Sequence, residues 1–277
     1  MSKKNWVLIK STDGDIELTD IPGLHFLEWT IPSVSTSANE LEMEGVDGVL
    51  PGENTFDPFE LELKFYFDGA DAKDLNLFAQ RMKGLVNQRK PYYVVHSDMP
   101  RFKYACNTAQ IEYDKITVGD MTFSITFRCY KGYAESLYST KDYNTQNGKF
   151  QFENGLLARD DIKYVFTDYE FNVYNGGNDI VDPHNHHKLK ISINIDAPKG
   201  FKLTNHNNET VFEYKTSIKA NKTLILDGIY PTIDAKRVGI NTNHGIIILD
   251  KGYNRMEISG ESLGKVKISF DFNFLYR

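Results

Sequence analysis

Three histidines and one aspartate lie close together in the stretch DPHNHHKLKI, which runs from Asp182 to Ile191. Histidine and carboxylate side chains bind Zn²⁺ when several of them converge on one point. On a strand, His184 and His186 would share one face, while His187 would face away. The stretch follows a run rich in Gly, Asn, Asp and Pro, a composition typical of a loop. We therefore expect a turn that leads into a strand, with solvated histidines and neither a metal nor a cofactor; a structural metal site is the alternative.

Other sequence patterns give little indication of an enzyme active site. Neither a G-x-x-x-x-G-K-[ST] phosphate loop nor a G-x-G-x-x-G dinucleotide motif occurs. A glycosidase needs two carboxylates at a matched separation across a cleft, and 38 acidic residues guarantee chance pairs. Cys106 and Cys129 lie in strand-like runs and lack a Cys–His signature, so we expect two buried free thiols. These observations favour a protein that is not an enzyme.

The length and composition limit the architectures that could position any site. A chain of 277 residues suits two domains, each with its own core. Aromatic and β-branched residues are frequent, which favours strands over helices. No run of about 18 apolar residues occurs, so we expect no membrane insertion, and the first residues lack the apolar segment of a secretory signal. Synthesis in a reducing cytoplasm is the expectation.

Charge is distributed unevenly along the chain. The formal net charge of −6 argues against general binding to nucleic acid. Residues 1–60 contain twelve acidic residues and three lysines, a net charge of −9, so the remainder sums to +3. This asymmetry is explained either by solubility or by a subunit whose acidic surface meets a basic surface on its neighbour.

The first half of the sequence predicts an antiparallel β domain with one embedded helix. Residues 38–69 form a long predicted hairpin, whose tip GVDGVLPGEN is longer than a compact hairpin needs. A single apolar stripe predicts a helix within residues 71–90, with Asp71 as its N-cap and Pro91 after its end. Because only one helix lies among the strands, repeated βαβ units are excluded.

The second half predicts a different architecture. Residues 135–148 are polar and aperiodic, so we expect a linker there between a domain of residues 1–134 and a domain of residues 149–277. Short strands divided by turns then imply a β-sandwich or jelly roll. In such a sandwich Tyr174, Tyr230 and Tyr253 are candidates for contacting a sugar.

The order of these features resembles the distal tail protein family of long-tailed (siphovirus) phages. In the N-terminal half, GVDGVLPGE stands where the family has a glycine-rich hairpin tip, TFDPFELELKFYFDG precedes the helix, and MTFSITFRCYKGYAES closes the domain. In the C-terminal half, the positions that match the family pattern are Asn175, Gly176, Asn178, Pro183, Asp227, Gly245, Leu249, Gly252, Asn254 and Gly260. Each motif is degenerate, but the ordered set covers nearly the whole chain. The HNHH stretch has no counterpart in the family pattern.

The resemblance implies a structural virion protein of the tail tip or baseplate, made in the host bacterial cytoplasm. Members of the family form hexameric rings through their N-terminal domains. The ring joins the tail tube protein to the tail-associated lysin or tail fibre hub. The C-terminal domain is similar to galectins or carbohydrate-binding modules, and it often anchors receptor-binding proteins for host attachment. For this chain the resemblance therefore implies a homohexamer with these partners, and a galectin-like C-terminal sandwich.

The long hairpin from Glu40 to Phe56 is the candidate for the contact that closes such a ring. Its acidic and apolar side chains would meet basic side chains of the neighbouring subunit. The candidates are Glu42, Glu44, Val46, Asp47, Val49 and Leu50 on the hairpin, and Arg81, Lys83, Arg89, Lys90, Arg101 and Lys103 on the neighbour. Exposed ion pairs contribute little individually, so apolar contacts would supply most of the stability. A free carbohydrate-binding, lectin-like adhesion module and an enzyme acting on cell-wall glycans remain as alternatives.

Overall fold

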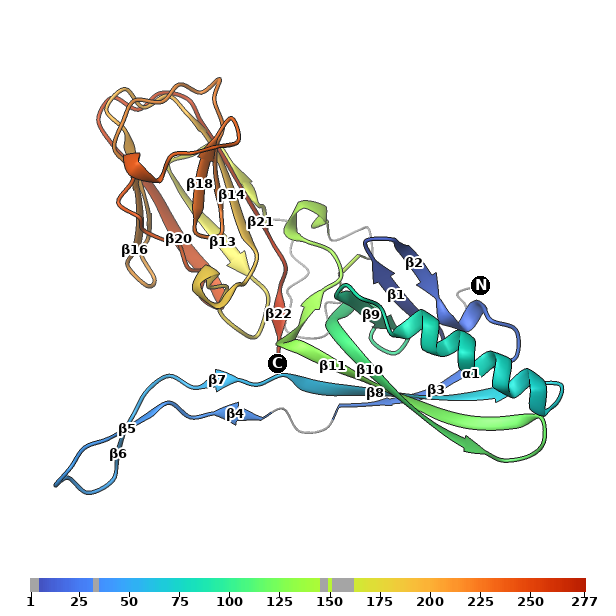
Figure 1. The fold of residues 1–277 in the computed structure, drawn as a ribbon. Coiled ribbons are helices and arrows are strands. Elements are labelled where there is room, and N and C mark those ends of the chain that lie inside the picture. Colours follow the sequence, from blue (N-terminus) through green and yellow to red (C-terminus); the bar gives the residue numbers. More distant parts are fainter. Residues whose placement is uncertain (1–4, 32–34, 145–148, 151–161) are drawn as a thin grey trace. The chain divides into compact units, whose positions relative to one another are not determined.

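Antiparallel strands form almost all of the regular structure of this chain. A computed structural model describes residues 5–31, 35–144, 149–150 and 162–277 (Figure 1). The chain divides into two compact units, one comprising Met1–Ala134 with Arg277 and the other Glu135–Tyr276. The prediction of a mainly β chain, with one helix embedded in the N-terminal strands, is confirmed for the described residues. No helix within those residues is both long and apolar enough to cross a membrane.

The first unit consists of strands β1 to β11 and helix α1. Their bounds are β1 Val7–Ser11, β2 Gly14–Glu17, β3 Leu24–Thr30, β4 Thr36–Ser37, β5 Glu40–Glu42, β6 Val49–Pro51, β7 Thr55–Phe56, β8 Phe59–Asp68, α1 Ala72–Val86, β9 Tyr92–His96, β10 Phe102–Lys115 and β11 Asp120–Ser136. Seven of these strands form one sheet in the order β2-β1-β9-β10-β11-β8-β3. The remaining four pair as β4 with β7 and β5 with β6.

Helix α1 packs against the sheet because its apolar side chains recur at helical spacing. Its buried residues are Leu75, Phe78, Met82 and Val86. The Phe78 ring stacks on Phe67 of β8 at a centroid distance of 3.8 Å. The Asp71 side chain accepts hydrogen bonds from two backbone N–H groups of the first turn, so the predicted N-cap is confirmed. The helix ends at Val86, before Arg89 and Lys90, which therefore lie outside it.

The two cysteines lie side by side in the core of the first unit. Cys106 of β10 and Cys129 of β11 are both fully buried and free, with 3.7 Å between their Sγ atoms. Burial raises the pKa of the Cys106 thiol well above its ordinary value. The expectation of buried free thiols is thus confirmed, and these groups serve packing.

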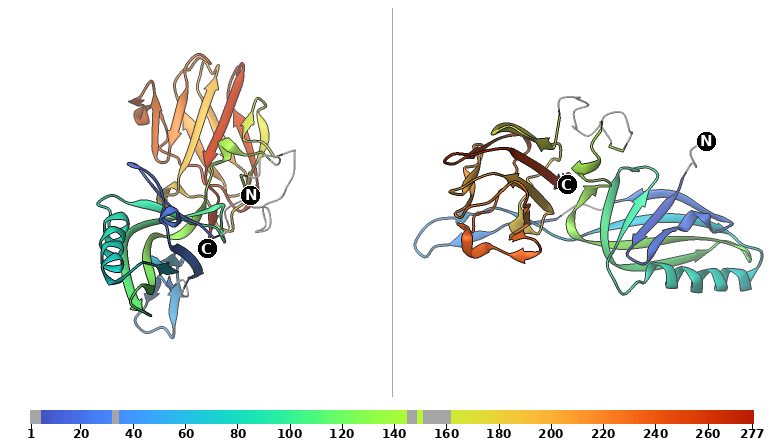
Figure 2. Two further views of the ribbon diagram at one scale, coloured as in Figure 1. Left: turned by 90° about the vertical axis from the view of Figure 1, so that its right-hand side faces the viewer. Right: turned by 90° about the horizontal axis from the view of Figure 1, so that it is seen from above.

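The second unit is a sandwich of two antiparallel sheets (Figure 2). Its strands are β12 Val165–Phe166, β13 Glu170–Asn175, β14 Leu189–Ile195, β15 Phe201–Asn205, β16 Thr210–Tyr214, β17 Leu224–Asp227, β18 Tyr230–Ile233, β19 Lys236–Arg237, β20 Gly252–Ser259, β21 Val266–Phe272 and β22 Leu275–Tyr276. The sheets have the orders β12-β21-β14-β17-β18-β19 and β13-β20-β15-β16. Phe171 of one sheet and Phe270 of the other place their rings 6.0 Å apart, so the two sheets share one core.

Residues 135–144, within the stretch expected to be a linker, pack in the second unit. Thr140 is buried, and its hydroxyl donates to the carbonyl of Phe270 at 2.8 Å while accepting from the N–H of Phe272 at 3.1 Å. The Ser136 N–H donates to the Phe274 carbonyl at 2.8 Å. Residues 145–148 of the expected linker lie outside the described residues.

Candidate functional site

The hairpin predicted over residues 38–69 is shorter in the structure. Residues 35–56 form a two-stranded ribbon, here called the arm, while Phe59–Asp68 form β8, which pairs with β3 and β11 in the main sheet. Every residue of the arm is exposed. Pairing of Thr36 with Phe56 continues further out as pairing of Leu41 with Leu50. The turn at the tip contains Gly45, at a φ of 81°, a left-handed conformation that glycine adopts without strain. The arm therefore extends from the sheet instead of folding back onto it (Figure 1).

The arm exposes large apolar side chains that no core covers. They are Leu41, Met43, Val46, Val49, Leu50 and Phe56, each between 38% and 59% exposed. Directly opposed residues of an antiparallel pair share one face of a ribbon, so Leu41 and Leu50 form an apolar pair on one face. An isolated two-stranded ribbon is marginally stable in water, and a contiguous exposed apolar surface commonly marks an interaction site.

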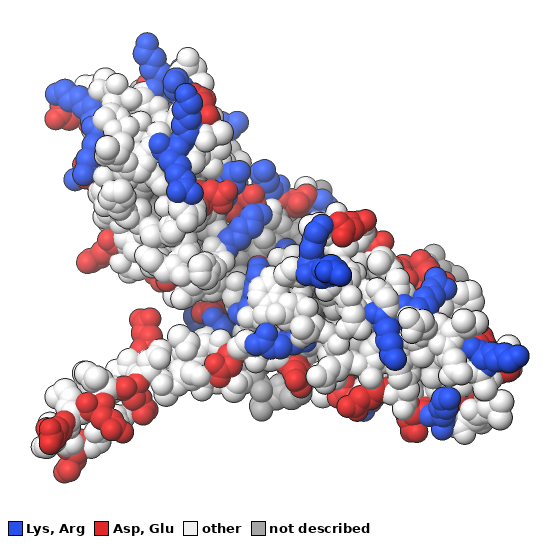
Figure 3. All heavy atoms as spheres, in the orientation of Figure 1, with Lys and Arg blue, Asp and Glu red and all other residues white. Residues whose placement is uncertain are grey.

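The arm is also acidic. Glu40 and Glu42 lie on the face opposite the apolar pair, because side chains alternate along a strand. From Glu40 to Glu53 the sequence contains five acidic residues and no lysine or arginine, and Figure 3 shows the arm tip with red atoms and no blue ones. The side chains of Glu42, Glu44, Val46, Asp47, Val49 and Leu50 are therefore brought together on one exposed element, as the sequence predicts. A partner for this surface would combine apolar contacts with positive charge.

The predicted basic partners separate into two groups. Lys90 pairs with Asp13 at 3.0 Å, and the Lys103 ammonium lies 4.7 Å from the centre of the Tyr93 ring, so both are engaged within the unit. The other candidates have no ion pair with any described residue, and they are Arg81, Lys83, Arg89 and Arg101. Arg81 and Lys83 are exposed on α1.

The arm and α1 occupy opposite ends of the first unit (Figures 1 and 2). An arm in this position does not reach the helix of its own chain. Any contact between the acidic arm and Arg81 or Lys83 therefore requires a second molecule.

The histidine stretch forms a capped turn. Residues Pro183–Asn185 make a short 3-10 helix, and the Asp182 carboxylate accepts from the backbone N–H of His184 at 2.9 Å. His187 is buried, and its Nδ1 accepts from the backbone N–H of Asp182 at 3.1 Å. The expected turn into a strand is confirmed, but His187 is not solvated as predicted, because its imidazole is part of the turn. The described residues contain no group of three or more His, Cys, Asp or Glu side chains that could hold a metal ion.

One catalytic pattern is present that the sequence argument overlooked. Residues Gly260–Gly264 read GESLG and match the G-x-S-x-G sequence of hydrolase nucleophiles. Ser262 lies at a φ of 56° in the turn that connects β20 of one sheet to β21 of the other. A hydrolase nucleophile instead lies between a strand and a helix, hydrogen-bonded to a base. The Ser262 side chain forms no hydrogen bond to any described residue, so the match lacks the required context.

The positions that carry the family resemblance stabilise loops of the second unit. The Asn175 amide donates to the carbonyl of Asp179 at 2.9 Å, and its oxygen accepts from the Gly177 N–H at 3.1 Å. Asn254 is fully buried and donates to the Asp250 carbonyl at 2.9 Å. These residues therefore determine backbone paths and provide no reactive group.

The tyrosines proposed for sugar contact do not form one platform. Tyr174 is buried and packs against Tyr253, with ring centroids 4.8 Å apart. Tyr230 belongs to the other sheet, and Arg237 lies 4.5 Å from the centre of its ring. The three rings are therefore distributed over two sheets.

Most of the sheet of the first unit, together with α1 and the arm, lies within the part of the chain that resembles a known family. Residues 14–129 match the family model of the phage tail protein RIFT-related domain. The resemblance to phage tail proteins inferred from the ordered motifs is thereby confirmed. No curated protein matches the chain.

A solved structure shares the fold. The crystal structure of SPP1 Dit (gp 19.1), described as a paradigm of the hub adsorption apparatus in phages that infect Gram-positive bacteria, matches with a TM-score of 0.68 and 12% identity, covering 98% of this chain and 100% of that one. Two structures of the phage p2 baseplate in its activated conformation also match. The one with Ca has a TM-score of 0.41 and 12% identity over 98% of each chain. The one with Sr has a TM-score of 0.40 and 14% identity over 97% of this chain and 98% of that one.

Proposed function

We propose that this chain is a distal tail protein, a non-enzymatic structural component of the virion tail tip. Six copies of the first unit close into a hub ring that joins the tail tube to the tail-associated lysin or tail fibre hub. The second unit, a galectin-like sandwich, anchors receptor-binding proteins. The phage tail family of residues 14–129 and the fold shared with SPP1 Dit support this proposal.

The exposed apolar pair of the arm is the observation that favours assembly most directly. A ring needs a heterologous interface, in which one surface of a subunit meets a different surface of the next. The arm is one such surface, and basic side chains such as Arg81 and Lys83 are candidates for the other. Opposite charges would set the register, while Leu41 and Leu50 would lose contact with water.

Native mass of the full chain tests this assembly. Wild-type protein is expected as a species of six chains, and the double variant Leu41→Asp with Leu50→Asp as a folded monomer with an unchanged far-UV circular dichroism spectrum. The unchanged spectrum follows because both side chains are exposed within a single chain. The matched control is Ile229→Asp with Ile240→Asp, which places the same two charges on side chains that are 48% and 91% exposed in the second unit, and it should remain hexameric.

Two results would contradict the proposal. One is a wild-type chain that remains monomeric at high concentration and is also missing from purified virions. The other is a double variant that assembles as well as the control. Turnover of cell-wall glycans by the wild-type chain would refute the non-enzymatic part.

A further inference from the structure

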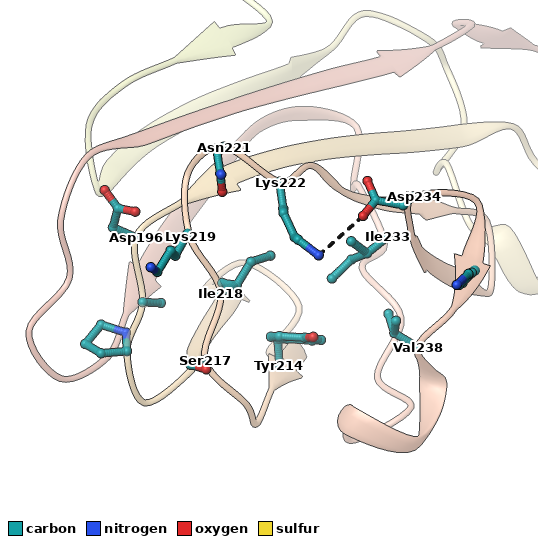
Figure 4. A pocket seen from close by; sticks show the side chains of 13 residues that line it. Asp196, Tyr214, Ser217, Ile218, Lys219, Asn221, Lys222, Ile233, Asp234 and Val238 are labelled. Atoms are coloured by element: carbon teal, nitrogen blue, oxygen red, sulfur yellow. Dashed lines mark ion pairs between the residues drawn. The ribbon is translucent and has the colours of Figure 1, made fainter.

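The second unit contains a cavity of about 770 Å³ next to the β18–β19 hairpin (Figure 4). Three chain segments line it, namely residues 196–198 after β14, the end of β16 with the following residues 217–222, and the β18–β19 hairpin. Backbone hydrogen bonds between Ala197 and Ile218, at 2.9 and 3.0 Å, join the first two segments, and the ion pair of Lys222 with Asp234 joins the second to the hairpin. The cavity is therefore a built feature of the sandwich and has the size typical of ligand sites.

Apolar side chains and two hydroxyl residues, Tyr214 and Ser217, line the cavity between its charged groups. Ile218, Ile233 and Val238 surround the hollow (Figure 4). Tyr214 is only 5% exposed, yet its hydroxyl has no hydrogen-bond partner among the described residues. The hydroxyl oxygen itself is not buried, so it is free to donate to a ligand that fills the cavity.

The rim of the cavity has surplus positive charge. Lys222 and Asp234 form an ion pair at 3.4 Å, and the Asp196 carboxylate accepts from the Ala220 N–H at 2.7 Å. These contacts occupy both acidic side chains of the rim. Lys219 and Lys236 line the same cavity without an ion-pair partner among the described residues.

The surface beside the cavity is suited to a macromolecule. Ile240, two positions beyond the lining residue Val238, is 91% exposed. Exposed aliphatic side chains of this kind contribute to protein interfaces and offer nothing to the hydroxyl groups of a glycan.

We propose that this cavity binds an acidic peptide segment of another tail protein. A large apolar side chain of that segment fills the space above Ile218 and Ile233. A carboxylate next to it pairs with Lys219 or Lys236, and a backbone carbonyl accepts from the Tyr214 hydroxyl. The inference rests on the proposed docking role of the second unit, but it does not require ring closure.

A peptide-display selection on the full chain tests the inference. The probe is a random library of linear dodecapeptides, and selected peptides are resynthesised for fluorescence anisotropy. Enriched peptides should share a large apolar residue flanked by Asp or Glu. The double variant Lys219→Glu with Lys236→Glu should raise the Kd at least tenfold, and Tyr214→Phe should raise it severalfold.

The matched control is Lys251→Glu with Lys265→Glu, which changes the net charge equally at exposed positions that do not line the cavity. It should leave the Kd within about twofold of wild type. Absence of enrichment, enrichment of basic peptides, or equal Kd values for the wild type and the rim variant would overturn the inference. A glycan array in which the rim variant loses a bound sugar would also overturn it.

Ring assembly and peptide binding are measured separately. The arm variant Leu41→Asp with Leu50→Asp should still bind the selected peptides, because the cavity lies within the second unit. Peptide binding by a monomeric wild-type chain would support the cavity inference while contradicting the hexameric hub.

Discussion

The side-chain amide of Asn205 donates a 2.8 Å hydrogen bond to the side-chain oxygen of Asn254, and neither residue is exposed. Asn254 also donates to the carbonyls of Asp250 and Gly252, at 2.9 and 3.2 Å. Its oxygen additionally accepts from the Asp250 N–H at 2.8 Å. One buried amide therefore uses both its donor and its acceptor capacity to fix the loop that leads into β20.

Replacing this amide by a carboxylate should destabilise the second unit. In Asn254→Asp, the backbone carbonyls of Asp250 and Gly252 would lose their N–H donor and face a carboxylate oxygen instead. The buried carboxylate would also lack a positively charged partner. We expect the free energy of unfolding to fall by at least about 2 kcal/mol, measured by urea denaturation. Asn185→Asp makes the same chemical change at an exposed position and should leave stability nearly unchanged. Equal stability of the two variants would show that the buried amide is not needed.

Gly245, a second position that carries the family resemblance, should not tolerate a larger side chain for a steric reason. A Cβ atom on Gly245 would lie 1.8 Å from the carbonyl oxygen of Val211, which itself accepts a hydrogen bond from the Asn243 side chain. Because the obstacle is backbone, Gly245→Ala should cost roughly 2 kcal/mol or more of unfolding free energy. Gly239→Ala is the control, since its nearest neighbour atom would be 3.7 Å away. A thermal melt distinguishes them, and equal midpoints would refute the steric account.

Part of this architecture could be predicted from local sequence. The spacing of apolar residues and the N-cap Asp71 predicted the start and the buried face of α1, because helix periodicity and capping are local properties. The position of the arm followed from its length and turn residues. The apolar pair of Leu41 with Leu50 did not, because the register depends on the conformation of the glycines at the tip.

Other features depend on contacts between distant residues. Asn254 was recognised as a family position, but its role involves the carbonyl of Val173, 81 positions earlier in the chain. The sequence predicted that His187 is solvated like its two neighbours, but the turn brings its Nδ1 to the backbone N–H of Asp182 and buries the ring. The cavity lysines gave no sequence signal, because three separate segments bring them together.

His96 gives the first unit a specific dependence on pH. It is fully buried, its ring nitrogens have no hydrogen-bond partner among the described residues, and its ring centroid lies 4.9 Å from that of Trp29 and 5.8 Å from that of Tyr104. Burial lowers the pKa of His96 from 6.5 to about 4, and the nearby Asp98 opposes this only partly. The unfolded chain therefore takes up a proton before the folded one does. Stability is complete above pH 6.5 and falls by about 3 kcal/mol as the pH drops from 6.5 to about 4.

A variant that lacks His96 isolates the contribution of this histidine to the pH dependence of stability. His96→Phe keeps an aromatic ring against Trp29 and removes the titrating group, so its stability should decline less between pH 7 and pH 4.5. His25→Phe, at an exposed histidine of the same unit, should retain the wild-type pH dependence. Urea denaturation at several pH values gives the three curves. Parallel curves for the wild type and His96→Phe would exclude His96 as the source.

Charge reversal on the arm tests which surface of the neighbour receives it. The variant Glu42→Lys, Glu44→Lys and Asp47→Lys keeps Leu41 and Leu50 but turns each attraction into repulsion. Exposed ion pairs contribute about 0.2–1 kcal/mol each, so three reversals should weaken association at least roughly tenfold, as measured by sedimentation velocity over a concentration series. High salt should reduce the difference between variant and wild type, because screening acts on both attraction and repulsion.

Restoration by the opposite change would identify the partner surface. If α1 receives the arm, adding Arg81→Glu and Lys83→Glu to the reversed arm should recover most of the lost affinity. Adding Lys251→Glu and Lys265→Glu, at exposed positions of the second unit, should recover none. If Lys251→Glu with Lys265→Glu restores the affinity, or if neither pair does, α1 is excluded as the binding surface for the arm. Recovery by Arg101→Glu alone would instead place the arm beside β10, because Arg101 directly precedes that strand.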